Sequence, residues 1–215
     1  YSPDVIGIQE GLKEQVDYLM DNLPQYGVVG EGRKGGDDDE HMAIFYKHKL
    51  LRLRELSSFW LSETPEIAGS GPDVNPRMVT WARLEYPSDY RGAWNTQEFY
   101  LFNTHFFTGR HTLAKNSSAT LIMNRTRHLR DFGHWSKHRP IFLVGDFNSQ
   151  PGSLVYRILT GDGETEDSSR FKDSTDRQGR RIDWILYRGR VKVAHYEEID
   201  YNVEGRYPSD HLPIV

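Results

Sequence analysis

The chain has 215 residues, of which 37% are hydrophobic and 27% are charged, a composition typical of globular proteins. It contains no cysteine, which excludes disulfide bonds, thiol catalysis and zinc–thiolate sites. Its formal charge of −4 argues against a cationic protein that binds nucleic acid non-specifically, but it does not exclude one that meets a phosphate at a local site. No apolar run approaches the roughly 20 residues that span a bilayer, so no membrane span is predicted.

The first half of the chain predicts several strands and one helix. DVIGIQ (4–9) is a short apolar run typical of a buried strand. A helix that ends before Pro24 is predicted next, because apolar residues recur at helical spacing: Leu12, Val16, Leu19 and Leu23. EGRKGGDDDE (31–40) predicts a glycine-rich loop whose acids form a solvated tip. Further strands are predicted at 42–46, 50–56, 78–86 and 98–105, with a loop at 62–76.

The second half predicts one long helix and three more strands. Helical periodicity runs from about Leu113 to Asp131, with Leu113, Leu121 and Leu129 among its apolar members. Strands are expected at 140–144, 182–187 and 191–199. Because hairpin-length turns and helices both separate the strands, we expect a layered α/β protein with a mixed sheet.

Polar side chains follow or interrupt several of these strands, where a buried strand would not select them. In α/β sheets, ligands gather at strand ends, where loops present side chains on a rigid frame. If these ends meet, they form a site with oxygen-bearing groups and two histidines: Glu10, Asp146, Asn148, Asp183, Asp210, His105 and His211. Hard oxygen ligands without thiols suit Mg²⁺ or Mn²⁺, and histidines beside such an ion suit the hydrolysis of a phosphate ester.

Five motifs in this order carry a resemblance that covers essentially the whole chain: DVIGIQE (4–10), FNTHF (102–106), VGDFNSQP (144–151), RIDWIL (181–186) and PSDHLPIV (208–215). Together they resemble the endonuclease/exonuclease/phosphatase superfamily, the fold of pancreatic deoxyribonuclease. The resemblance implies a layered α/β sandwich of two mixed, mainly antiparallel sheets flanked by helices. FWLSETP (59–65), followed by PRMVTWARLEY (76–86), resembles a subgroup of largely uncharacterised metal-dependent hydrolases within it.

The resemblance implies roles at the first strand end and at the GDFN turn. Glu10 is expected to be the principal metal ligand; the alternative is a solvent-facing Glu that precedes a helix. Asp146 is expected to polarise the attacking water, and Asn148 to orient the water or the phosphate. The alternative there is structural, because Asn148 or Ser149 can cap a helix that Pro151 begins.

The resemblance also implies a pair of side chains, His211 and Asp183, that contacts the scissile phosphate, in which the carboxylate sets the tautomer of the ring. Asp210 is expected beside them as a second metal-side or water-orienting carboxylate; the alternative for this segment is an exposed turn. His105 would donate to a non-bridging phosphate oxygen, unless backbone groups satisfy it. Arg77 is either a phosphate contact or a surface arginine in a loop, and we favour the latter.

Three tryptophans are assigned to the core, Trp60, Trp81 and Trp184; the alternative for Trp60 is a platform for the substrate.

Two features depart from the family pattern. Members usually carry, upstream of the QE motif, a strand with an asparagine that helps to bind metal or phosphate, and this chain starts after that point. We therefore expect residues 1–215 to be one domain that lacks its first strand and is trimmed at both ends. The second departure is Phe106–Phe107 after the NTH motif, where the subgroup usually has Asp-His. This apolar pair is expected to change the rim of the pocket and leaves the substrate class open.

The leading hypothesis is an Mg²⁺- or Mn²⁺-dependent phosphoesterase in which water attacks the phosphorus of a phosphodiester or phosphomonoester in line. Nucleic acid, nucleotide, phospholipid head group and sugar phosphate all remain candidate substrates. GDFNSQPGSLVYRIL (145–159) resembles the poly(A)-removing 3′-exoribonucleases, although no basic track with interleaved aromatics accompanies it. A non-catalytic binding domain that retains the fold is the other alternative. Nothing in the sequence indicates a protein partner.

Overall fold

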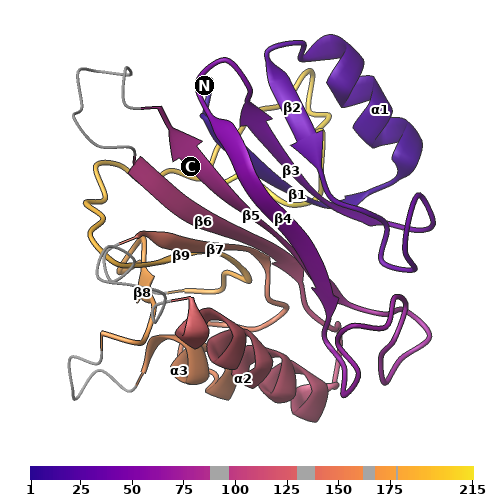
Figure 1. Ribbon diagram of the computed structural model, residues 1–215, viewed down its shortest axis with the longest axis vertical. Helices are drawn as coiled ribbons and strands as arrows, with labels where there is room; N and C mark the ends of the chain where they lie inside the picture. The colour runs from indigo at the N-terminus through magenta and orange to yellow at the C-terminus, as the bar shows by residue number, and fades with distance from the viewer. Residues whose placement is uncertain (88–96, 130–138, 162–167, 178) are drawn as a thin grey trace.

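The computed structural model describes residues 1–87, 97–129, 139–161, 168–177 and 179–215. Two β-sheets pack against each other, with α1 on the outer side of one sheet and α2 and α3 on the outer side of the other (Figure 1). This is the layered α/β sandwich of two mixed, mainly antiparallel sheets that the sequence motifs predicted. Within the described part of the chain, no helix has the length and apolar character needed to cross a membrane.

The smaller sheet is antiparallel and has the order β1-β3-β2. Its strands are β1 (Val5–Gly11), β2 (Tyr26–Val29) and β3 (His41–Lys47), and helix α1 (Lys13–Asn22) joins β1 to β2. Val16 of α1 packs with Phe45 of β3 in a cluster of buried residues.

The larger sheet has the order β4-β5-β6-β7-β9-β8. Among the described strands of this sheet, only β6 and β7 are parallel neighbours, and the other pairs are antiparallel. The parallel pair is joined across the sheet through α2 (Thr112–His128), as a crossover connection requires. The remaining elements are β4 (Arg52–Trp60), β5 (Met78–Tyr86), β6 (Gln97–His105), β7 (Ile141–Asp146), α3 (Leu154–Thr160), β8 (Lys172–Asp173) and β9 (Asp183–Arg188).

Alternating residues of the central strands serve two different cores, because successive side chains of a strand point to opposite faces. On β6, Tyr100 and Phe102 pack with the helices α2 and α3, in the cluster that also contains Trp184. Phe99 and Leu101 of the same strand face the smaller sheet and pack with Ile44 of β3. The larger sheet is therefore apolar on both faces.

The two sheets lie close together at β1. A Cβ atom on Gly7 would lie 2.8 Å from Cγ2 of Val144 on β7, so only glycine fits there. Next to it, the buried Asn103 of β6 donates from Nδ2 to the carbonyl oxygens of Ile8 and Ala43, at 2.8 and 2.9 Å. These contacts bring the end of β1 beside the ends of β6 and β7.

Most predicted elements are present with shifts of a few residues at their ends, but three predictions are wrong. Residues 191–199 form no strand; they contain a single isolated bridge residue, Glu198, which pairs with Ile214. An apolar, β-branched pattern does not make a strand unless a neighbour supplies a hydrogen-bonded ladder. Helix α3 begins at Leu154 and its cap is Ser153, so neither Asn148 nor Ser149 caps a helix at Pro151. Leu113 is 83% exposed, outside the apolar face of α2.

Two loop predictions also need correction. Asp37 and Asp38 are exposed as expected, but Arg33 is buried and Asp39 and Glu40 are only partly exposed. Phe106 and Phe107 are fully buried in the core with α2 and α3, so they do not form the rim of a pocket. The core assignments of Trp60 and Trp184 are confirmed, whereas Trp81 is only partly buried and packs against the core. The predicted end of the long helix at Asp131 lies outside the described residues.

Candidate active site

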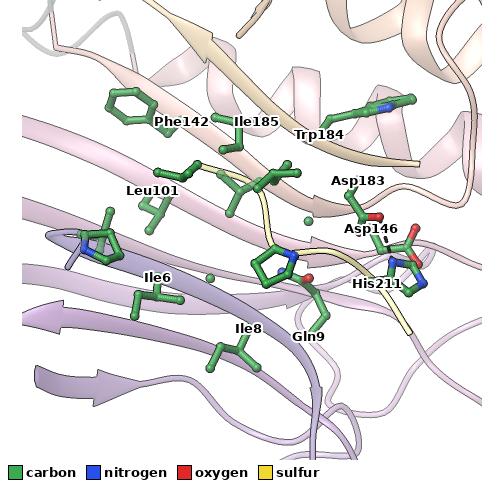
Figure 2. Close-up of a pocket in the computed structure, with 18 of the residues that line it drawn as sticks. Ile6, Ile8, Gln9, Leu101, Phe142, Asp146, Asp183, Trp184, Ile185 and His211 are labelled. Atoms are coloured by element: carbon green, nitrogen blue, oxygen red, sulfur yellow. Dashed lines mark hydrogen bonds and ion pairs between the residues drawn. The ribbon is translucent and has the colours of Figure 1, made fainter. Parts of the chain in front are cut away.

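The register of the larger sheet places three candidate side chains in one row. His105 at the end of β6 is opposite Asp146 at the end of β7, and Asp146 is opposite Asp183 at the start of β9. All three line one cavity of about 1710 Å³ between the sheets, together with Glu10 and His211. Figure 2 shows Asp146, Asp183 and His211 close together in this cavity. Side chains that lie far apart in the sequence therefore meet at one edge of the sheet.

Glu10 reaches this row from the smaller sheet because β1 is irregular near its end. The register of β1 against β3 shifts between Ile8 and Gly11, and Glu10 has a left-handed backbone with φ of 59°. A non-glycine residue in this region costs of order 1 kcal/mol and is held in place by the surrounding structure. Oε1 of Glu10 lies 3.5 Å from Nδ1 of His105, so Glu10 faces the other sheet although 61% of its side chain is exposed.

Asp146 is held by the turn that follows it. The backbone N–H of Asn148 donates to Oδ1 of Asp146 at 2.7 Å, and Nδ2 of Asn148 contacts Oδ2 at 3.1 Å. The same amide nitrogen donates to the carbonyl oxygen of Phe106, and Asn148 has a left-handed φ of 45°. Burial raises the pKa of Asp146 to about 6, the Asn148 N–H opposes this shift, and the charges of Asp183 and Glu10 add to it.

His211 and Asp183 form the pair that the sequence predicted, with 2.8 Å between Nδ1 and Oδ2. Burial raises the pKa of Asp183, although the contact with His211 opposes this. Burial alone would lower the pKa of His211, but the hydrogen bond to Asp183 and the charges of the neighbouring carboxylates outweigh it, and the net shift is upward. The pair therefore favours a protonated imidazole whose Nε2 remains available.

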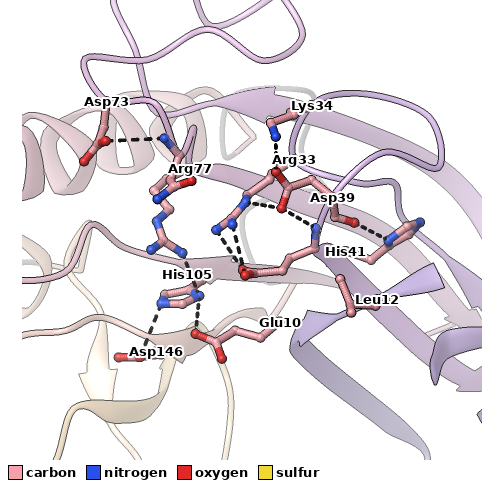
Figure 3. A network of polar contacts seen from close by, with 12 residues as sticks. Glu10, Leu12, Arg33, Lys34, Asp39, His41, Asp73, Arg77, His105 and Asp146 are labelled. Atoms are coloured by element: carbon pink, nitrogen blue, oxygen red, sulfur yellow. Dashed lines mark hydrogen bonds and ion pairs between the residues drawn. The ribbon is translucent and has the colours of Figure 1, made fainter. Parts of the chain in front are cut away.

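His105 contacts side chains rather than backbone groups. Its Nδ1 lies 2.9 Å from Nη1 of Arg77, and its Nε2 lies 3.5 Å from Oδ2 of Asp146 (Figure 3). Burial, reinforced by the charges of Arg77 and Arg33, lowers the pKa of His105 to about 3. Since Arg can only donate, Nδ1 of the neutral ring accepts, and Nε2 carries the proton toward the site.

Arg33 and Glu40 in this network were not predicted from the sequence, and the position of Arg77 was predicted wrongly. Arg77 is only 7% exposed and is not a surface arginine. Glu40 lies beside Glu10 because Gly11 pairs with His41, and it is held by Arg33 in an ion pair of 2.7 Å. The one available signal was that Glu40 directly precedes a strand.

Among the residues that the structure describes, two groups of side chains could hold a metal ion. One consists of Glu10, Glu40 and His105, and the other of Asp146, Asp183 and His211; within each, the ligand atoms lie within 4.8 Å of one another. Glu10 and Glu40 supply carboxylate oxygens to the first group, and Asp146 and Asp183 supply them to the second. The donor set therefore fits a divalent ion that prefers oxygen.

Asp210 belongs to neither group of the described residues. It lines the same cavity and acts on Asp183 and His211 through its charge.

Comparison with known proteins agrees with this geometry. Residues 1–211 match the model of the Endonuclease/Exonuclease/phosphatase family. The chain belongs to this family. Members of the endonuclease/exonuclease/phosphatase family act as phosphatases and nucleases, and many of them depend on a metal ion. No curated protein sequence gives a significant match to the chain.

Several solved structures of the endonuclease/exonuclease/phosphatase family share the fold. A mannosyl-6-phosphatase from Bacteroides thetaiotaomicron is 28% identical, with a TM-score of 0.82 over 98% of this chain and 83% of that one. An endonuclease/exonuclease/phosphatase family protein from the same organism is also 28% identical, with a TM-score of 0.80 over 98% and 81%. TDP2 of D. rerio, complexed with a single-strand DNA product, is 18% identical, with a TM-score of 0.67 over 99% and 84%.

Proposed function

We propose that this protein is a divalent-metal-dependent phosphoesterase in which a water molecule attacks phosphorus in line. The observation that carries the proposal is the row of His105, Asp146 and Asp183 across three paired strands, which Glu10 meets from the other sheet. Metal-assisted ester hydrolysis uses acids, histidines and a metal ion. This cavity has the acids and the histidines, and a group of side chains that could hold the ion. The endonuclease/exonuclease/phosphatase family supports the same reaction class.

Glu10 is the residue that we assign as principal ligand of Mg²⁺ or Mn²⁺, with Glu40 beside it. Carboxylate oxygens suit both ions, and the two glutamates lie in one of the metal-binding groups. A bound ion would supply Lewis-acid stabilisation of the charge that develops on the phosphoryl oxygens. Asp210, at the mouth of the cavity, is assigned the orientation of water near His211.

The remaining side chains would bind, orient and exchange protons. Asp146 accepts a hydrogen bond from the attacking water, while Asn148 fixes the carboxylate through its backbone N–H and its amide. His105 donates from Nε2 to a non-bridging oxygen. His211, kept protonated beside Asp183, donates to the phosphate from Nε2.

A phosphate monoester of a sugar is the substrate class that we propose first. Its support is the 28% identical mannosyl-6-phosphatase, whose structure covers nearly the whole chain. The net charge of −4 also disfavours a broad contact with a nucleic-acid backbone. Single-stranded RNA with a 3′ end is the comparison substrate for the nuclease alternative.

A metal titration against a small substrate panel tests the function. Turnover of a hexose 6-phosphate, p-nitrophenyl phosphate, bis-p-nitrophenyl phosphate and a 3′-labelled oligoribonucleotide is measured with Mg²⁺ or Mn²⁺ and again with EDTA. We expect metal-dependent hydrolysis, which Asp146→Ala and His211→Ala each lower by about 10²–10⁴-fold.

The control variant is Asp38→Ala, at an exposed loop tip, which should leave the rates unchanged. If EDTA and both active-site substitutions leave the rates unaltered, or if no substrate is turned over, the result would instead support a binding domain that retains the fold.

A further inference from the structure

Lys115 is a buried cation in the first turn of helix α2 and is only 8% exposed. Its Nζ donates to the backbone carbonyl oxygens of Gly109 and Asn148, at 3.0 and 2.7 Å. Among the residues that the structure describes, no carboxylate lies within 4.0 Å of this ammonium group. The lysines that do pair with carboxylates there are more exposed: Lys13, Lys34 and Lys47.

The stability of helix α2 does not account for the position of Lys115. The start of a helix carries a partial positive charge, which disfavours a cation in the first turn. A buried ammonium group is also costly unless it is paired and hydrogen-bonded. Burial lowers the pKa of Lys115, and the charge of Asp146 opposes this shift. The two carbonyl oxygens that Lys115 binds therefore indicate its role better than the helix does.

These two carbonyl groups belong to the loops that follow β6 and β7, the strands that end at the candidate site. The loops already contact each other, because the N–H of Phe106 donates to the carbonyl oxygen of Asp146 at 2.8 Å and its own carbonyl accepts from Nδ2 of Asn148 at 3.1 Å. Lys115 adds hydrogen bonds from a charged donor, which are stronger than neutral ones. It therefore joins the loop at Gly109 to the turn at Asn148.

Asn148 is the residue through which this contact reaches Asp146. Its left-handed φ of 45° is a conformation that the surrounding contacts must maintain. Its N–H and its Nδ2 are directed at the two oxygens of Asp146, at 2.7 and 3.1 Å, while its carbonyl oxygen accepts from Lys115. Because Asn148 is held at its N–H, its side chain and its carbonyl group, both donors stay directed at the carboxylate.

We propose that Lys115 is a positioning residue, which binds the carbonyl oxygen of Asn148 and so fixes the turn that orients the Asp146 carboxylate toward the attacking water. Its effect on rate rests on the proposed phosphoesterase function, whereas its effect on the turn does not require a reaction. Lys115 does not line the cavity, so it acts through Asn148 and not by contact with the substrate. A misplaced carboxylate slows the attack of water, because the reaction requires an aligned geometry.

Two competing interpretations make different predictions for Lys115→Met. If Lys115 only stabilises the fold, the variant unfolds more easily but the folded protein keeps its kcat. If the ammonium group binds the anionic substrate, KM rises while kcat stays the same. A positioning residue instead lowers kcat, leaves KM nearly unchanged, and loosens the turn at Asn148 even when no substrate is present.

The first experiment measures amide hydrogen exchange by ¹H–¹⁵N NMR on the whole chain in EDTA, without substrate. We expect the amide of Asn148 to exchange at least about tenfold faster in Lys115→Met than in the unmodified protein. The amide of Thr175 is the internal control, because it donates to Oδ1 of Asp173 at 3.2 Å in the same spacing of two residues. Its exchange rate should not change.

The second experiment measures kcat and KM with Mg²⁺ for the ester of the panel that the unmodified protein hydrolyses fastest. We expect Lys115→Met to lower kcat by about 10–10²-fold and to change KM by less than about twofold. Lys115→Arg retains the charge and the N–H donors, so it should recover part of the lost kcat. In the Asp146→Ala background the effect of Lys115→Met should be much smaller, because the carboxylate that it positions is absent.

Lys13→Met is the matched control, because Lys13 also lies in the first turn of a helix, α1, but pairs with Asp17 at the surface. It should leave both kcat and the exchange rate of Asn148 unchanged. Circular dichroism checks that each variant is folded, and Lys115→Gln replaces Lys115→Met if the latter does not fold. Unchanged exchange at Asn148, or an increase in KM without a loss of kcat, would overturn the proposal.

The two proposals fail in different ways. If turnover depends on Asp146 but Lys115→Met alters neither kcat nor the exchange of Asn148, only the role of Lys115 is removed. If Lys115→Met speeds the exchange of Asn148 but the unmodified protein hydrolyses no ester, Lys115 still fixes the turn and the proposed reaction is removed.

Discussion

At the scale of single residues, the site concentrates charge that folding alone would not favour. Asp146 and Asp183 are directly opposite on paired strands, and burial raises the pKa of both carboxyl groups. Like charges and burial destabilise the ionised forms. Such an arrangement is expected where binding or catalysis, and not stability, selects the residues.

The first residue-scale prediction concerns Asp146→Asn in the metal-free protein. The folded-state pKa of about 6 lies above the ordinary aspartate pKa of 3.8, so the stability that the protonated form contributes is present below about pH 4 and lost as the pH rises through about 6. Above about pH 6 the ionised carboxyl of Asp146 lowers the free energy of unfolding. We expect Asp146→Asn to raise the free energy of unfolding by about 1–3 kcal/mol at pH 7.5.

Urea unfolding in EDTA at pH 7.5 and at pH 4 measures this effect. The difference between the variant and the unmodified protein should shrink toward zero at pH 4, although the variant loses activity at every pH. A variant that is less stable at pH 7.5 would mean that the hydrogen bonds to Asn148 outweigh the electrostatic cost.

At the scale of elements, short irregular segments place the side chains of the candidate site. The register shift in β1 turns Glu10 toward the larger sheet, and the turn from Asp146 to Ser153 leads directly into α3. That helix is only two turns long, so its first turn depends on its cap. Oγ of Ser153 accepts from the N–H of Tyr156 at 3.2 Å, which satisfies one of the free N–H groups at the helix start.

The element-scale prediction is that Ser153→Ala lowers the free energy of unfolding by about 1 kcal/mol, because it leaves that N–H without its cap. Chemical denaturation measures the loss. Ser153→Asp serves as the matched control, since Asp caps as well as Ser and should keep the stability near that of the unmodified protein. Equal stability of the Ala and Asp variants would show that the cap contributes nothing here.

At the scale of the whole molecule, the site exists only while the two sheets keep their relative position. Glu10 and Glu40 belong to the smaller sheet side, and His105, Asp146 and Asp183 belong to the larger sheet. Asn103 joins them, because its Nδ2 donates to carbonyl oxygens of β1 and β3, and its Oδ1 accepts from Nε2 of Gln9 at 2.5 Å. Asn103 therefore joins the two sheets through hydrogen bonds inside an interface that is otherwise apolar.

The whole-molecule prediction is that Asn103→Ala lowers the free energy of unfolding by about 2–4 kcal/mol, since the three hydrogen bonds of this buried side chain are lost together. Thermal and urea unfolding measure the change. Asn22→Ala, on the exposed end of α1, is the control and should cost less than about 0.5 kcal/mol. A small effect at Asn103 would indicate that water replaces its hydrogen bonds and that apolar contacts alone hold the sheets together.

Asn103 and His105, two residues apart on β6, also show the limit of what a local sequence pattern predicts. Both were visible as polar residues at the end of one predicted strand, and the sequence could not separate them. In the structure Asn103 faces the smaller sheet and is structural, whereas His105 ends the row of catalytic candidates. For residues 191–199 the local pattern was misleading. It predicted a strand, but no continuous ladder of hydrogen bonds formed there.

Much of this protein was determined by the sequence itself. The alternation of apolar residues specifies which segments become strands and helices, and the acids and histidines at the strand ends mark the candidate site, because these are local properties of the chain. Only the tertiary structure decided that Arg77 is buried, that Glu40 joins Glu10, and that Phe106 and Phe107 belong to the core. Burial and the loss of a counterion depend on what distant segments bring alongside a residue, and no local pattern contains that information.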